Sequence, residues 1–175
     1  MNKKYINDAI RTDLESYSIV NDRLKTIGDL KYIFSLLKSI EVSCSVIDLE
    51  KKFLFYGKER FTKSCETNNV CLSEDKARLL HSLIGIITEV GELCVHVINI
   101  LEEKEVDLTN VLEEFGDISW YQALGVTAIS GLDKQIDTDF LNKNIEKLKA
   151  RYPNKFTEHD ALNRNLEKER NVLEG

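Results

Sequence analysis

Residues 79–101, LLHSLIGIITEVGELCVHVINIL, decide the fold of this chain, because they carry only two formal charges, Glu89 and Glu92. A helix that is apolar around most of its circumference is buried among other helices. A membrane-spanning helix is the competing interpretation of such a run. Two glutamates in the middle of the run argue against it, because charge in the bilayer core is costly. We therefore expect a buried helix in a helical bundle.

A second segment, residues 111–132, repeats the pattern as VLEEFGDISWYQALGVTAISGL, with its three charges at Glu113, Glu114 and Asp117. A short charged turn at 102–107 separates the two segments. Helices joined by so short a turn pack antiparallel. The predicted fold is an all-α bundle around an antiparallel central helix pair.

The acids of the two segments are spaced three apart, as Glu89/Glu92 and Glu114/Asp117, so each pair shares a helix face. A hairpin centred near Glu105 places both pairs at a similar height, although the sequence leaves open whether they face each other. Carboxylates gathered in a buried setting stay ionised only around a cation. All-oxygen ligands suit Mg²⁺ or Mn²⁺.

Two other interpretations compete with this metal site. The acids could be solvated or paired with lysines of neighbouring helices. A di-iron bundle also places Glu on facing helices, but it needs Glu-x-x-His on two of them. Val95 lies three residues beyond Glu92, and His96 misses that spacing by one. The iron interpretation is therefore disfavoured.

The rest of the chain also reads as helical, since its 175 residues hold only 1 Pro and 8 Gly. Apolar spacing and caps predict helices at 2–17, 22–40, 74–103, 107–131, 137–152 and 157–173. We expect residues 41–75 to be irregular, with at most one or two short helices and a polar loop at 62–69.

Composition limits the function and the cellular compartment. The net charge of −6 argues against a protein that holds nucleic acid by backbone electrostatics. The four cysteines form no Cys-x-x-Cys motif, and the N-terminal residues carry no apolar stretch of a signal peptide. These features predict a cytoplasmic protein with reduced thiols that binds neither nucleic acid nor membrane.

The acids and their surroundings carry a family resemblance. Glu89-x-x-Glu92 followed by Glu114-x-x-Asp117 resembles the ExxE…ExxD signature of the MazG-like all-α nucleoside triphosphate pyrophosphohydrolases, in their short, phage-type form. The flanking runs, LHSLIGIITEVGEL and LEEFGDISWY, strengthen the likeness. So do NIEKLKARYPNKF and ALNRNLEKER near the C-terminus, and the opening that contains Tyr5, Ala9, Arg11 and Thr12. The segment Phe55-Tyr56-Gly57-Lys58, which such proteins often carry between the two motifs, precedes the first motif here.

The resemblance implies Mg²⁺-dependent cleavage of a nucleoside triphosphate into the monophosphate and pyrophosphate. Glu89, Glu92, Glu114 and Asp117 then hold the metal ions that lower the pKa of the attacking water. Glu113 orients a ligand or serves as base, or else is a solvated surface acid. The resemblance also implies one domain over 1–175, with a family-atypical 18–75, a catalytic core at 76–152 and a C-terminal arm at 153–175.

Four downstream residues are candidates for binding the substrate phosphates: Asn144, Lys147, Arg151 and Lys155. Lys147 and Arg151 lie four apart on one helix face, and Arg grips phosphate in a bidentate way while Lys acts as a point charge. Ordinary surface cations are the alternative.

Trp120 and Tyr121 lie in an apolar run, and we expect them in the core. We expect His81 and His96 in the core or at its boundary, and not as ligands. The long apolar helices predict a homodimer or homotetramer. Two other functions stay open, a non-catalytic helical nucleotide-binding protein and a structural helical oligomer.

Overall fold

A computed structural model describes residues 3–13, 17–26, 30–58 and 70–174. Within these ranges the chain forms helices and no strand, which confirms the all-α prediction. The helices are α1 (Lys3–Ile10), α2 (Ser18–Thr26), α3 (Leu30–Tyr56), α4 (Glu74–Leu101), α5 (Leu108–Leu132), α6 (Phe140–Arg151), α7 (Glu158–Leu162) and α8 (Leu166–Glu174).

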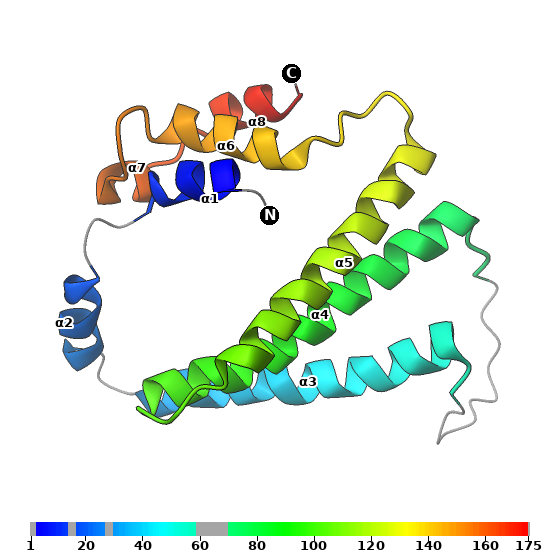
Figure 1. Cartoon of the computed structure of the whole chain (residues 1–175), viewed down its shortest axis with the longest axis horizontal. Helices are drawn as coiled ribbons and strands as arrows, with labels where there is room; N and C mark the ends of the chain where they lie inside the picture. The colour runs from blue at the N-terminus through cyan, green and yellow to red at the C-terminus, as the bar shows by residue number, and fades with distance from the viewer. Residues whose placement is uncertain (1–2, 14–16, 27–29, 59–69, 175) are drawn as a thin grey trace. The chain divides into compact units, whose positions relative to one another are not determined.

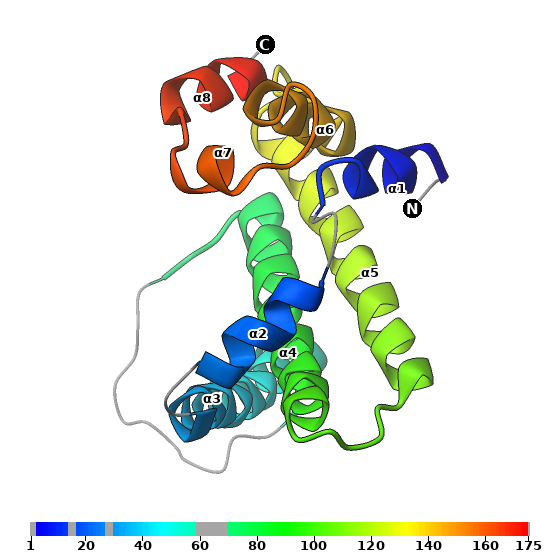
Figure 2. The ribbon, with the colours of Figure 1, turned by 90° about the vertical axis from the view of Figure 1, so that its left-hand side faces the viewer.

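The chain divides into two compact units. One comprises Asp29–Ile136 and holds α3, α4 and α5, and the other comprises Met1–Gly28 with Asp137–Gly175. In the first unit α4 packs against both α3 and α5, as Figures 1 and 2 show. Because the sequence order of contacting residues runs in opposite directions, each neighbouring pair is antiparallel: Ser82 meets Tyr121 and His96 meets Asn110 between α4 and α5. The predicted central hairpin is therefore confirmed.

The two central helices begin within one residue of the predicted starts, and a side chain caps each of them. Ser73 accepts a hydrogen bond from the backbone N–H of Lys76 at the start of α4. Asp107 accepts from the N–H groups of Thr109 and Asn110 at the start of α5. Side-chain caps satisfy donors that have no partner inside the helix, so these residues fix where the helices start.

Residues 41–56 correct the prediction of an irregular segment, because they continue α3 to Tyr56. No Gly or Pro interrupts the sequence from Leu30 to Tyr56, and Ser39, Ser43 and other hydroxyls there bond to the carbonyl four residues earlier. The helix ends where Gly57 adopts a φ of 71°, a conformation that glycine permits. The predicted helix at 22–40 is likewise replaced by α2 and α3. The polar loop predicted at 62–69 lies outside the described residues.

The C-terminal prediction needs a second correction, because the single helix predicted at 157–173 is two helices, α7 and α8. Thr157 caps α7 by accepting from the N–H of Asp160, as the capping-box pattern predicts. The chain then leaves the helix at Asn163, and Asn165 accepts from the N–H of Lys168 at the start of α8. An Asn side chain competes with the helix for backbone groups, which favours such a break.

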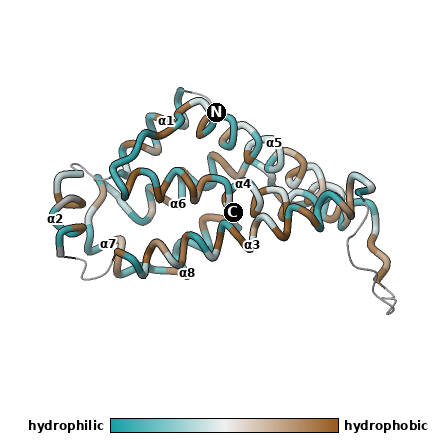
Figure 3. Tube along the Cα trace, turned by 90° about the horizontal axis from the view of Figure 1, so that it is seen from below, coloured by the Kyte–Doolittle hydropathy of each residue, from teal (hydrophilic) through white to brown (hydrophobic). Residues whose placement is uncertain are grey.

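In the second unit α6 packs against both α1 and α8. Figure 3 shows that hydrophobic and hydrophilic residues alternate along these helices, as they do in amphipathic helices. Arg11 donates to the carbonyl oxygen of Asn154 at 2.9 Å, which ties the segment after α1 to the segment after α6. Lys168 of α8 donates to the carbonyl oxygen of Ala150 at 3.0 Å near the end of α6.

Close contacts between backbones hold α4 against its neighbours. A Cβ atom added to Gly91 of α4 would lie 2.1 Å from Cβ of Cys44 on α3. Between α4 and α5, the Ser82 hydroxyl donates to the Tyr121 carbonyl oxygen at 2.7 Å in a buried contact. Tyr121 and His96 are buried, His81 is half-buried, and these three follow the prediction.

Trp120 does not follow the prediction of a core position, because 56% of its surface is exposed. It lies on α5 beside the buried Tyr121, and consecutive helical residues point about 100° apart. Tyr121 therefore lies inside the contact with α4, whereas Trp120 lies at its edge, with its ring centre 6.1 Å from that of His81 on α4.

Among the described residues, α4 is the one helix long and apolar enough to cross a membrane by length and composition. Core helices of soluble proteins pass the same test, so this is weak evidence in either direction.

The close approach at Gly91 yields a stability prediction. Gly91→Ala should lower the free energy of unfolding by about 1–3 kcal/mol, because the added methyl group overlaps Cys44. Gly116→Ala on α5 is the matched control, since a Cβ atom there meets nothing within 4 Å. That change should leave stability equal or raise it by up to about 1 kcal/mol. Urea unfolding of both variants measures the difference, and equal stabilities would contradict the described α3–α4 contact.

Candidate metal centre

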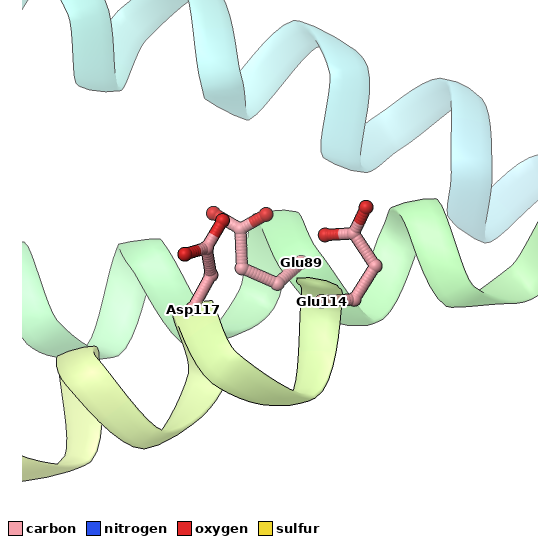
Figure 4. Close-up of side chains that lie close together, drawn as sticks. All are labelled: Glu89, Glu114 and Asp117. Atoms are coloured by element: carbon pink, nitrogen blue, oxygen red, sulfur yellow. The ribbon is translucent and has the colours of Figure 1, made fainter. Parts of the chain in front are cut away.

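Three of the predicted acids come together between α4 and α5. Glu89 comes from α4, and Glu114 and Asp117 come from α5, and one oxygen from each carboxylate can lie within 4.8 Å of the others. Figure 4 shows the three side chains extending to the same side of the helix pair, the side along which α3 runs. Glu89 of α4 therefore lies beside the Glu114/Asp117 pair of α5, which answers for three of the four acids the point that the sequence leaves open.

The acids differ in their exposure to solvent. Glu89 is 6% exposed and Glu114 is 3% exposed, whereas Asp117 is exposed. The fourth predicted acid, Glu92, is not part of this group of three, but it interacts electrostatically with Glu89 and Glu114. The arrangement is thus a buried carboxylate pair with one solvent-facing member and a fourth acid beside it.

Crowding of these carboxylates changes their protonation. Burial and the charge of Glu92 raise the pKa of Glu114 from its ordinary value of 4.5 to about 7. Burial, with the charges of Glu89 and Asp48, raises the pKa of Glu92. Both raised pKa values indicate that neighbouring positive groups neutralise only part of the negative charge at this site.

A buried lysine of α3 supplies part of the missing positive charge. Lys51 is 5% exposed, and its Nζ lies 3.1 Å from Oδ1 of Asp48 and 3.4 Å from Oε1 of Glu89. The same ammonium donates to Oγ1 of Thr88 at 2.8 Å and lies 5.3 Å from the ring centre of Tyr121. Burial opposes the charged ammonium, but the bonds to Asp48 and Tyr121 and the charge of Glu89 raise the pKa of Lys51.

Asn110 positions the second buried acid. Its Nδ2 donates to Oε1 of Glu114 at 2.9 Å and lies 3.5 Å from Oε2 of Glu113. Its Oδ1 lies 2.8 Å from Nε2 of His96. Glu113 is exposed, so the structure places it beside the cluster and on the solvent side.

The donor set fits a hard divalent cation. All of the groups that converge are carboxylate oxygens, which suit Mg²⁺ or Mn²⁺ better than softer metals. The raised pKa of Glu114 fits too, because a cation would favour the charged form that burial now disfavours. Exposed acidic groups are common without an ion, so the burial of Glu89 and Glu114 is the stronger part of this argument.

The predicted phosphate-binding residues Asn144, Lys147, Arg151 and Lys155 belong to the other compact unit. Within it, Arg151 forms a bidentate pair with the buried Glu169, with Nε–Oε1 at 2.8 Å and Nη2–Oε2 at 2.5 Å. Arg164 donates to the same carboxylate at 2.7 Å. Arg151 thus has a structural partner, and its role in binding phosphate stays a prediction.

Sequence reasoning missed Lys51, Asp48, Thr88 and Asn110. The first two lie in the segment expected to be irregular, so they were assigned to no helix face. Asp48 and Lys51 are three residues apart, and Cys44 precedes Asp48 by four residues. This spacing is typical of one helix face and could have identified both residues. Asn110 occupies the first turn of α5, where an Asn usually indicates capping instead of contact with an acid one turn later.

Removal of the buried ammonium should weaken the fold. Lys51→Met keeps most of the side-chain volume but leaves Glu89 and Asp48 without their shared counter-charge, so we expect a loss of about 3–5 kcal/mol. Lys52→Met is the matched control, because Lys52 pairs with the same Asp48 but is 45% exposed. That change should cost less than about 1 kcal/mol. Denaturant unfolding in EDTA compares the two, and a similar small loss in both would contradict the role of Lys51.

Stability of the metal-free protein should also depend on the charge of Glu114. The unfolded chain releases this proton near pH 4.5, whereas the folded protein keeps it until about pH 7. The folded state is therefore progressively penalised as pH rises between these values. Glu114→Gln, which cannot ionise, should melt roughly 5 °C above wild type at pH 8 in EDTA, with little difference at pH 4.5. A gap that is the same at both pH values would show that Glu114 does not titrate in this window.

No family model, curated protein or solved structure matches this chain. The resemblance to the MazG-like pyrophosphohydrolases therefore rests on the motifs quoted from the sequence. The cluster of Glu89, Glu114 and Asp117 is the structural observation that bears on it.

Proposed function

We propose that the protein hydrolyses a nucleoside triphosphate to the monophosphate and pyrophosphate with Mg²⁺, or with Mn²⁺ in its place. The observation that carries this proposal is the convergence of carboxylate oxygens from Glu89, Glu114 and Asp117 within 4.8 Å. A triphosphate carries several negative charges, so carboxylates can hold it only through cations. A polyphosphate–metal complex is therefore the ligand that suits this site.

In the reaction, the oxygen of a water molecule bonds to phosphorus, the bridge between the α and β phosphates breaks, and the water gives up a proton. A bound divalent ion would supply charge neutralisation for the phosphate oxygens and a lower pKa for the water. Glu89, Glu114 and Asp117 are the proposed ligands, with Glu92 beside them. Glu113, exposed at the edge of the cluster, is the side chain open to take the proton.

Neighbouring side chains keep the proposed ligands in place. Lys51 and Thr88 both lie within 3.4 Å of Oε1 of Glu89, at 3.4 Å and 3.2 Å. Asn110 donates to one oxygen of Glu114. Such supporting contacts orient metal ligands and limit the movement that binding requires.

The rest of the proposal concerns residues and partners beyond the cluster. Asn144, Lys147, Arg151 and Lys155 are proposed to bind phosphate oxygens, by their charge and hydrogen-bonding groups. Exposed apolar residues on α4 and α5, among them Leu83, Ile87, Leu112 and Phe115, support a homodimer or homotetramer. A cytoplasmic location fits a nucleotide substrate.

One observation favours a structural role as the second candidate. Lys51 already gives Glu89 and Asp48 a positive partner, so part of the acidic charge is compensated without a metal ion. In that case the acids would fasten α3, α4 and α5 together, and nucleotide would not be cleaved. A non-catalytic nucleotide-binding protein is the intermediate possibility.

Product analysis separates these candidates. With Mg²⁺ and a panel of ribo- and deoxyribonucleoside triphosphates, we expect pyrophosphate and not orthophosphate, and no reaction in EDTA. Asp117→Asn and Glu89→Gln should reduce turnover by more than about 100-fold, since loss of a residue that only supports a metal ligand can cost that much. Glu105→Gln, which changes an exposed acid in the α4–α5 turn, should leave turnover unchanged.

The other outcomes identify the alternatives. Steady orthophosphate release, or full activity in EDTA, would contradict the proposed reaction. A rise in melting temperature with Mg²⁺ and nucleotide but without product would indicate a sensor. An unchanged melting temperature under all conditions would favour the structural role.

A further inference from the structure

A pocket of about 280 Å³ lies between α3 and α4, and the mechanism proposed above does not use it. Ser45 and Asp48 of α3 and Glu92 and His96 of α4 are in its wall, together with Asn110 of α5. Pockets for small molecules begin at about 300 Å³, so this volume suits one compact ring system instead of an entire nucleotide.

The pocket adjoins the acid cluster through shared residues. Thr88 and Asn110 are both in its wall, and Oγ1 of Thr88 lies 3.2 Å from Oε1 of Glu89. Asn110 donates to Glu114 at 2.9 Å. A ligand that places its phosphates at the acids therefore has this pocket as the neighbouring space for its other end.

The charge of the wall selects which end of a nucleotide can enter. The wall contains the carboxylates of Glu41, Asp48 and Glu92, and none of the described residues in it is a lysine or arginine. Without a bound cation such a surface repels phosphate groups, and the proposed cation lies at Glu89, Glu114 and Asp117 instead of in this wall. The base of a nucleotide is neutral, so it is the part that fits.

His96 is also part of this wall. Because Nδ2 of Asn110 donates to Glu114, its Oδ1 accepts, and Nε2 of His96 must carry the hydrogen of their 2.8 Å bond. In the neutral ring Nδ1 is then an acceptor. His96 is 8% exposed, and this Nδ1 is buried without a hydrogen-bond partner among the described residues. An atom so enclosed is not open to a ligand in the pocket, so the charged acceptors that the wall presents are its carboxylates.

We propose that this pocket receives the base of the nucleotide and favours a base with an exocyclic amine, as in cytosine, adenine or guanine, over uracil or thymine. The proposal rests on the proposed function, because it assumes that the phosphates lie at Glu89, Glu114 and Asp117. The carboxylate acceptors of Glu41, Asp48 and Glu92 match N–H donors. Cytosine presents an amine donor at the position where uracil and thymine present a carbonyl acceptor, which these acceptors would leave unpaired.

CTP and UTP are the matched pair of substrates that tests this selectivity. With Mg²⁺ and the wild-type protein we expect kcat/KM to be at least about tenfold higher for CTP, since one hydrogen bond to a charged acceptor is worth that much. The same order should hold for dCTP against dTTP. Equal values, or a preference for UTP, would overturn the proposal.

A blocking variant tests the location of the base. Ser45→Tyr should fill the pocket from α3, and Ser43→Tyr is the matched control outside it. Both serines are exposed and donate to the carbonyl four residues earlier, so both variants should fold alike. Ser45→Tyr should raise KM for CTP at least about fivefold and leave inhibition by inorganic tripolyphosphate unchanged, while Ser43→Tyr changes neither.

Inhibition by tripolyphosphate distinguishes a failure of the base-pocket proposal from a failure of the proposed function. If Ser45→Tyr weakens tripolyphosphate as much as CTP, the pocket holds phosphates, and the base assignment is wrong. If no nucleotide is cleaved, the proposed function fails, but calorimetric binding of Mg²⁺–CTP and Mg²⁺–UTP still tests the pocket. Tighter binding of CTP that Ser45→Tyr removes would support it, and equal binding of both nucleotides would overturn it.

Discussion

The buried ammonium of Lys51 is the interaction on which the rest of the three-helix unit depends. Its Nζ lies within 3.4 Å of oxygens of Asp48 on its own helix and of Thr88 and Glu89 on α4. An acidic cluster of this density would otherwise push the helices apart or take up protons. Lys51 offsets part of the negative charge at Glu89, and the same contacts link α3 to α4.

Two kinds of signal made the centre of the molecule predictable from sequence. Local signals placed the helix ends, because Ser73 and Asp107 are caps whose effect depends only on the adjacent backbone. Periodicity placed the acids, because an i,i+3 spacing fixes the face of a helix whatever surrounds it. Because the turn is short, the acidic faces of α4 and α5 are expected at a similar height along the helix pair. In the structure Glu89 does lie next to Glu114 and Asp117.

The contacts that could not be predicted from the sequence depend on which helix packs against which. The polar Lys51 and Asp48 interrupt the apolar face of α3, so they weaken the pattern that identifies a buried helix, and their partners are far away in sequence. Trp120 has the same difficulty, since an aromatic residue in an apolar helix reads as core until the position of α4 is known. The family resemblance predicts a chemical role for the acids, but it does not predict the pocket between α3 and α4.

Glu114 has a consequence for how ion binding would be measured. Near neutral pH this buried carboxyl is protonated in part of the molecules. A divalent ion that binds to the carboxylate displaces that proton into the solution. The heat of binding then contains the ionisation enthalpy of the buffer, so two buffers of different enthalpy would report different apparent heats for the same ion. The difference between them counts the protons that leave, which reveals whether the ion has reached the buried side of the cluster or stays with the solvent-facing Asp117.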